Sequence, residues 1–118
     1  MSEKNKEIVQ QVNAAFEANN IEGFLDFCAD NVKWTMAGEK TIEGKNGIRE
    51  FANSMGDMEP PKINNKNMIA ETDSVAAYGD MTMNEKGTTN AYDYCDIYQF
   101  QDGKIVGLNS YVVKTGTK

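Results

Sequence analysis

The sequence predicts an α+β fold in which helices pack on one face of an antiparallel sheet. Apolar residues in the first half recur at helical spacing, those after residue 60 alternate with a period of two, and turn signals join the later segments into hairpins. Helices followed by hairpin-linked strands are typical of α+β domains. The chain has 118 residues, so we expect a single domain over residues 1–118.

The first half of the chain carries the helical patterns. One helix follows the capping residue Ser2 and is interrupted at Asn19-Asn20, and a short second helix covers residues 21–28. A third helix is expected to be capped by Asn46 and to end at Gly56.

The strands are expected over residues 32–36, 63–71, 74–83, 91–101 and 104–113. Pro60-Pro61 excludes helix before the second of them, and Asp102-Gly103 is a strong hairpin signal between the last two. Residues 38–47 look like a polar, turn-rich connection. The predicted order is therefore α-α-β-α-β-β-β-β.

Charge and composition exclude several classes of function. With 12 basic and 18 acidic residues the net charge is −6, which disfavours partners such as nucleic acids and anionic membranes. The chain has no histidine, so Ser-His-Asp and Cys-His systems and histidine-ligated zinc are ruled out. Any acid–base chemistry must use carboxylates, tyrosines, lysines or water.

Neither a cofactor nor a metal is indicated. Gly38 and Gly44-Lys45 do not have the spacing of a phosphate-binding loop, and Asp93 and Asp96 point to opposite faces of their strand. Cys28 and Cys95 are too few for a disulfide framework. With a charged N-terminus and no long apolar run, we expect a cytoplasmic protein.

The strand at residues 91–101 is the most informative segment for function. One face carries four aromatic residues with Asp96 in their midst. A carboxylate among aromatic rings loses solvation, which raises its pKa. Such a group either makes a structural hydrogen bond or faces a ligand cavity, and the residues alone leave both interpretations open.

The preceding strand suggests where a cavity could lie. Its residues Val75, Ala77, Gly79, Met81 and Met83 share one face and include small residues in mid-strand, which leave space beside them. The alternative is that this row, like Trp34 and Met36 on the first strand, is ordinary core.

Four segments between about Ile8 and Val113 together form a recognisable pattern: Ala14-Ala15-Phe16 with Phe24-Leu25, Ala29-Asp30-Asn31-Val32, Ile42-Glu43-Gly44 with Gly47-Ile48, and residues 96–105. In these segments the chain resembles the nuclear transport factor 2-like superfamily, in its SnoaL-like, ketosteroid-isomerase-like branch. The resemblance implies a cystatin-like cone, a curved antiparallel sheet around three N-terminal helices with an apolar pocket inside. It also implies a homodimer formed through the outer sheet face, where Cys95, Ile97 and Gln99 are uncharged.

The resemblance transfers only part of an active site. Asp96 matches the penultimate-strand Asp of ketosteroid isomerases, but Met36 and Phe16 stand where their Asp base and Tyr are found, so steroid-type isomerisation is not expected. Members similar to limonene-epoxide hydrolase need an Arg where this chain has Tyr94, and scytalone-dehydratase-like members need histidines. The single-Asp scheme of SnoaL-like cyclases departs least from this sequence.

Two functions follow from this resemblance. The first is a cofactor-free isomerase or cyclase acting on a small apolar carbonyl compound, with Asp96 and Tyr94 as catalytic residues; the second is a non-catalytic ligand-binding or dimerisation module of the same fold. The residues expected to line the ligand space are Phe16, Trp34, Met36, Phe51, Met55, Ala77, Gly79, Met81, Met83, Tyr98, Leu108 and Ser110.

Overall fold

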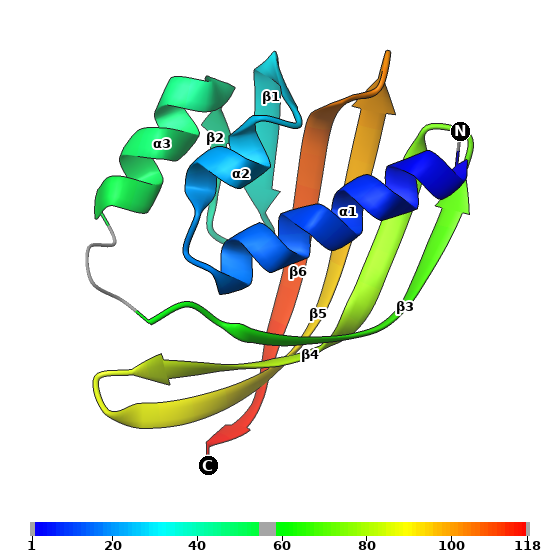
Figure 1. Ribbon diagram of the computed structural model, residues 1–118. Coiled ribbons are helices and arrows are strands. Elements are labelled where there is room, and N and C mark those ends of the chain that lie inside the picture. The colour runs from blue at the N-terminus through cyan, green and yellow to red at the C-terminus, as the bar shows by residue number, and fades with distance from the viewer. Residues whose placement is uncertain (1, 55–58, 118) are drawn as a thin grey trace.

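The computed structural model describes residues 2–54 and 59–117, and in these residues three helices lie against one face of a six-stranded sheet (Figure 1). The helices are α1 (Ser2–Glu17), α2 (Ile21–Leu25) and α3 (Gly44–Ser54). The strands are β1 (Cys28–Met36), β2 (Lys40–Glu43), β3 (Lys62–Glu71), β4 (Ser74–Glu85), β5 (Thr88–Gln101) and β6 (Lys104–Thr117). The α+β prediction is confirmed. None of the helices described has both the length and the apolar character needed to cross a bilayer.

The strands are ordered β2-β1-β6-β5-β4-β3 across the sheet. Strands β3 to β6 form an antiparallel meander, and β2 is antiparallel to β1. Strand β1 departs from the expected antiparallel pattern because it runs parallel to β6. This long-range pairing brings the helical first half of the chain against the last strand.

The connection between β1 and α3 contains more structure than the sequence predicted. Residues Lys40–Glu43 form a short edge strand on β1, between Gly38 and Gly44, which both have positive φ angles. Its single half-buried apolar residue, Ile42, gives too little alternation to predict a strand. Helix α3 begins at Gly44, so Asn46 does not cap it; the Asn46 side chain instead accepts a hydrogen bond from Arg49. The expected helix end at Gly56 lies outside the described residues.

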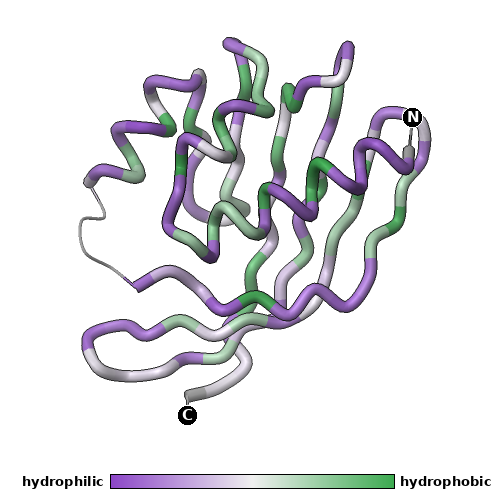
Figure 2. Tube along the Cα trace, in the orientation of Figure 1, coloured by the Kyte–Doolittle hydropathy of each residue, from purple (hydrophilic) through white to green (hydrophobic). Residues whose placement is uncertain are grey.

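The core lies between α1, α2 and the strands that pass behind them. Figure 2 shows hydrophobic segments on these strands where α1 crosses them. The side chains that fill this layer are almost fully buried: Ile8, Val9, Val12, Phe24, Leu25, Val75, Ala77, Tyr98, Phe100, Ile105 and Leu108. We call this packed layer, with the part of the inner sheet face that it covers, the sealed region. Its burial provides the main driving force for folding.

The outer face of the sheet carries apolar side chains that no described element covers. Tyr78, Cys95 and Tyr111 are aligned across β4, β5 and β6, and Val113 is 64% exposed. This agrees with the semi-polar surface expected from the sequence. The homodimer itself stays a prediction.

A bulge in β3 presses its backbone onto β4. The register shifts between Asn65 and Asn67, and the Asn64 carbonyl oxygen would lie 2.0 Å from a Cβ atom placed on Gly79. The space that we expected beside Gly79 is therefore occupied by β3 backbone. Glycine is required at this position because any side chain would collide with main-chain atoms that cannot move away.

We predict that Gly79→Ala lowers the free energy of unfolding by about 2–3 kcal/mol, because the added methyl group forces β3 off β4. Gly116→Ala is the matched control, since among residues 2–54 and 59–117 no atom outside Gly116 and its chain neighbours lies within 4 Å of a Cβ placed there, and it should change stability by less than about 0.5 kcal/mol. Urea denaturation of both variants measures the difference. Equal stabilities would contradict the close approach of the two strands.

Candidate functional site

Asp96 lies on the inner face of β5, among the aromatic residues of that strand. Tyr94, Tyr98 and Phe100 on the same face are all at least 94% buried, whereas Asp96 keeps part of its surface exposed. The strand register places Asp96 between Ala77 of β4 and Ser110 of β6. The prediction that the aromatic face of this strand is the buried one is thus confirmed.

Asp96 also marks a border on the inner face. On one side of it lies the sealed region. On the other side the inner face is more open: Met81 and Met83 of β4 are half-buried, and Val112, which pairs with Tyr94, is 44% exposed. We call this part, with Met36 of β1, the accessible region. A carboxylate at the border is shielded by the core and can still be reached from the accessible region.

Two polar side chains lie in a row beside the Asp96 carboxylate. Ser110 lies directly opposite Asp96 on β6, where its hydroxyl lowers the pKa of the carboxyl group as a hydrogen-bond donor, and the Ser110 Oγ accepts a hydrogen bond of 3.0 Å from the Trp34 indole Nε1. The three residues come from β5, β6 and β1; β5 and β6 form a hairpin, and β1 joins them through its parallel pairing with β6. This arrangement of Asp96, Ser110 and Trp34 therefore depends on the tertiary fold.

Burial raises the pKa of Asp96 to about 6, and the hydrogen bond from Ser110 opposes the increase. Burial disfavours the ionised form because the apolar surroundings solvate charge poorly, whereas a donor aimed at the carboxylate favours it. A carboxyl group with such a pKa exchanges its proton near neutral pH, as a general acid or base must.

The Trp34 ring is fixed by a cluster of aromatic side chains. Its centroid lies 5.8 Å from those of Phe16 and Phe24 and 6.2 Å from that of Phe51, and the Phe24 and Phe51 rings meet it edge to face. The Lys40 Nζ lies over the Phe51 ring, 5.0 Å from its centroid. Edge-to-face packing adds to the burial energy and restricts the indole to one orientation.

The hydroxyl group of Tyr94 already has a hydrogen-bond partner. Its hydroxyl donates a hydrogen bond of 2.8 Å to the Asn65 Oδ1 on the bulge of β3. Burial, followed by the charge of Asp96, raises the pKa of Tyr94 to about 12. The phenol thus stays protonated and keeps a lone pair free to accept a hydrogen bond. Sequence reasoning missed Asn65, because nothing in the pattern of β3 distinguishes it from its neighbours Asn64 and Asn67.

The phenol of Tyr98 is in the opposite situation. Tyr98 is fully buried, and within the described residues its hydroxyl has no hydrogen-bond partner. Burial raises the pKa of Tyr98 well above its usual value, and the Asp96 charge adds to the effect. The hydroxyl is a neutral donor held in the sealed region beside the candidate site.

The remaining residues expected to line a ligand space fall into separate groups. Ala77 and Leu108 are 1% exposed and belong to the packed core, whereas Met36, Met81 and Met83 are half-buried in the accessible region. Met55 lies outside the described residues.

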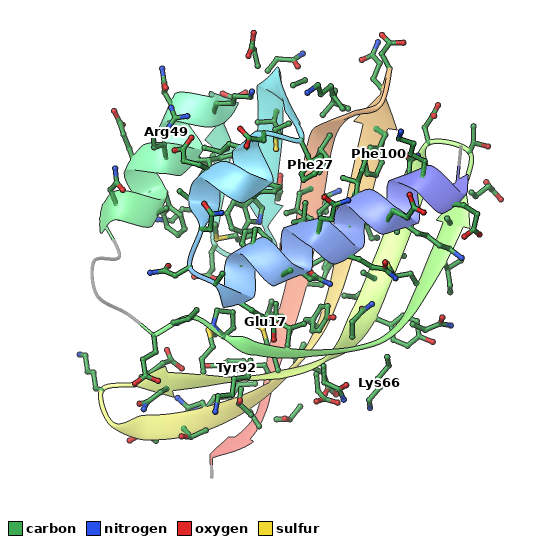
Figure 3. All side chains as sticks on the ribbon, viewed as in Figure 1. Glu17, Phe27, Arg49, Lys66, Tyr92 and Phe100 are labelled. Carbon is green, nitrogen blue, oxygen red and sulfur yellow. The ribbon has the colours of Figure 1, made fainter. Side chains whose placement is uncertain are left out.

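The β4–β5 hairpin extends beyond the helices, and its inner side carries polar contacts. The Glu85 carboxylate accepts hydrogen bonds from the Tyr92 hydroxyl and from the Asn90 amide. Figure 3 shows Tyr92 on this hairpin and Glu17 at the end of α1, where Glu17 accepts a hydrogen bond from the backbone N–H of Ile63. The Glu85 contacts lie within the hairpin, and the Glu17 contact joins the end of α1 to the start of β3. No group of three or more potential metal ligands of the Cys, Asp and Glu types occurs among residues 2–54 and 59–117.

A curved six-stranded sheet with three helices on its inner face is the architecture of the nuclear transport factor 2-like fold. A sequence model of the SnoaL-like domain matches residues 9–108. The chain therefore belongs to the SnoaL-like family. A search of curated proteins finds no match to the sequence.

Solved structures with the same fold include proteins of several kinds. An NTF2-like protein from Cytophaga hutchinsonii is 23% identical, with a TM-score of 0.76 over 96% of this chain and 99% of that one. TerC, crystallised with polyporic acid, is 24% identical with a TM-score of 0.79 over 91% and 89% of the two chains. An LEH-like epoxide hydrolase from M. tuberculosis is 12% identical with a TM-score of 0.85 over 95% and 84%. At these identities the likeness shows the fold alone.

The two tyrosines that flank Asp96 allow a matched comparison. We predict that Tyr94→Phe lowers the free energy of unfolding by about 1 kcal/mol, because the Asn65 amide oxygen loses its donor. Tyr98→Phe should leave stability unchanged or raise it by up to about 1 kcal/mol, since the lost hydroxyl has no partner to give up. Chemical denaturation tests both. A larger loss for Tyr98→Phe than for Tyr94→Phe would contradict the two assignments.

The raised pKa of Asp96 predicts a pH-dependent effect of Asp96→Asn on stability. The carboxyl group binds a proton more tightly in the folded state than in the unfolded state, where its pKa is 3.8. Its favourable contribution is therefore present at low pH and is lost as pH rises from about 4 to about 6. Above that range the ionised group costs up to roughly 3 kcal/mol, which the amide avoids.

Asp96→Asn should thus be more stable than the parent protein at about pH 8, and this advantage should disappear at about pH 4. Denaturation curves of both proteins across the range measure the difference, and Asp93→Asn on the exposed outer face is the control. A difference that does not vary with pH would contradict the raised pKa.

Proposed function

We propose that the protein binds a small, mostly apolar carbonyl compound in the accessible region and that Asp96 moves a proton on it as a general base and acid. The single observation that carries this proposal is the position of Asp96, mostly buried at the border of the core with its pKa raised to about 6. Functional acids and bases are characteristically found in such surroundings.

The chemistry needs one group that both removes and returns a proton. Above about pH 6 the Asp96 carboxylate is ionised and can take a proton from a carbon atom next to a carbonyl group, which leaves an enolate. The same proton, now on the carboxyl oxygen, returns to another atom of the ligand when the enolate rearranges or closes a ring. The protein is regenerated, and neither a metal nor a redox cofactor is consumed.

The side chains around the accessible region support an apolar ligand. Met36, Met81 and Met83 provide flexible, polarizable surface, and Val112 adds a branched aliphatic side chain. Methionines adapt to ligands of irregular shape. The fold neighbour TerC was crystallised with polyporic acid, and a predicted polyketide cyclase from Xanthomonas campestris, 17% identical, has the same fold with a TM-score of 0.78 over 93% of this chain and 90% of that one.

Tyr94 gives the proposal a further chemical preference. It lies on the accessible side of Asp96, and its proton is committed to Asn65. Its free lone pair can therefore accept a hydrogen bond from a hydroxyl group of the ligand. The ligand that fits best carries a hydroxyl group and a carbonyl group on an apolar skeleton.

A ligand is found first by mass spectrometry of compounds that co-purify with the protein and by thermal-shift screening of hydroxyketones, lactones and small aromatic compounds. With a compound that is turned over, we predict that Asp96→Asn lowers kcat about 10²–10⁴-fold while binding persists, because the amide cannot exchange a proton. For the parent protein, kcat/KM should rise with pH through about 6 as the base ionises.

Asp93→Asn is the matched control, because Asp93 is the nearest carboxylate on β5 that faces outward, and it should leave kcat unchanged. A ligand that binds and is never converted would favour the non-catalytic binding module instead. Undiminished turnover by Asp96→Asn would refute the proposed role of Asp96.

A further inference from the structure

We propose that Ser110 is a positioning residue for Asp96 and that Trp34 acts through it, the indole N–H directing the single Ser110 hydroxyl proton onto the carboxylate. The inference rests on the proposed function for its catalytic meaning, but the hydrogen-bond relay it describes can be measured in the absence of any ligand.

The direction of the relay follows from what each group can donate and accept. An indole N–H is only a donor, so across the 3.0 Å contact the Ser110 Oγ must accept. A serine hydroxyl has one proton and two lone pairs. Once one lone pair is used by Trp34, the proton points away from the indole, toward the Asp96 carboxylate on the neighbouring strand.

Ser110 and Trp34 are each held in place by further contacts. The Ser110 backbone carbonyl accepts a hydrogen bond of 2.9 Å from the Ala37 N–H, which fastens β6 to the end of β1. The Trp34 ring is clamped by Phe16, Phe24 and Phe51. A donor whose orientation is set before the charge appears stabilises that charge without further reorganisation.

The other groups around Asp96 do not duplicate this role. Tyr94 donates its proton to Asn65, and the charges of Asp80 and Glu17 help to raise the pKa of Tyr94. Tyr98 is sealed in the core, and Cys95 of the outer face is a neutral thiol whose pKa is raised by burial and by Asp96. The residues paired with Asp96 and Ser110 on β4 and β1 are Ala77 and Met36, which carry no charge. Among the described residues, Ser110 is therefore the donor that acts on the carboxylate.

The relay predicts how the Asp96 carboxyl titrates when its parts are removed. Carbon-detected NMR of the ligand-free protein follows the Asp96 carboxyl resonance, which is assigned by its absence from Asp96→Asn. Ser110→Ala should move the midpoint upward by roughly one pH unit, the size expected for the loss of one hydrogen bond to a charged group. Ser110→Thr keeps the hydroxyl and should restore the parent midpoint.

Trp34→Phe removes the indole N–H together with the five-membered ring that carries it, and keeps a six-membered aromatic ring in the cluster. It should move the midpoint in the same direction by a smaller amount, because the Ser110 proton is no longer constrained to one direction. In the double variant Trp34→Phe/Ser110→Ala the midpoint should equal that of Ser110→Ala alone, since Trp34 acts only through Ser110. Ser74→Ala, the same change elsewhere on the sheet, is the control and should leave the midpoint in place.

Two results would overturn the relay: an unchanged midpoint in Ser110→Ala, or a further upward shift when Trp34→Phe is added to Ser110→Ala. If Ser110→Ala does not fold, an unchanged midpoint in Trp34→Phe overturns it as well. Where a converted ligand is known, the acid limb of kcat/KM should move with the midpoint. The expected NMR shifts in a protein that converts no ligand would support the relay and refute the proposed function.

Discussion

The parallel pairing of β1 with β6 is the constraint on which the rest of the structure depends. It joins the helices and β1 to the antiparallel meander of β3 to β6. Through it Trp34 and Met36 come to lie beside Leu108 and Ser110. Without this pairing the aromatic cluster and the carboxylate would belong to separate halves of the molecule, and Ser110 would lose its hydrogen bond from Trp34.

Asp96 lies in apolar surroundings and has one compensating polar contact, with Ser110. Core side chains shield Asp96 on one side and raise its pKa, and the Ser110 hydroxyl limits that increase. The two effects bring the carboxyl group to a pKa of about 6, where both protonation states are populated near neutral pH. The neighbouring tyrosines stay neutral, since burial raises the pKa of each. Asp96 is thus the group in this cluster that can exchange a proton under ordinary conditions.

Much of this arrangement could be predicted from the sequence, because local patterns determine it. The alternation on β5 identifies Asp96 as the lone carboxylate on an aromatic face, and the Asp102-Gly103 turn pairs the end of β5 with the start of β6. The pairing of Asp96 with Ser110 also depends on a register shift between Gln99 and Phe100, which the turn does not predict. The absence of histidine restricts the chemistry to groups of this type.

What could not be predicted depends on contacts between segments distant in the chain. The hydrogen bond from Trp34 to Ser110 joins residues 76 positions apart, and no local pattern encodes it. The same holds for Asn65, whose contact with Tyr94 requires the β3 bulge. Gly79 was interpreted as a sign of empty space, whereas the structure uses its missing side chain to admit the backbone of β3. A small residue predicts a close approach, but the sequence does not show what approaches.

We infer that Asp96 of the folded, ligand-free protein is an acid–base group that titrates near neutral pH, unlike an ordinary surface carboxylate. Its own titration in the parent protein, followed by NMR at the carboxyl carbon, tests this most directly. We expect a midpoint at about pH 6, well above the value of 3.8 for an unperturbed Asp. A midpoint close to 3.8 would contradict it, because it would mean that the carboxylate is fully solvated or so strongly hydrogen-bonded that it cannot serve as a base.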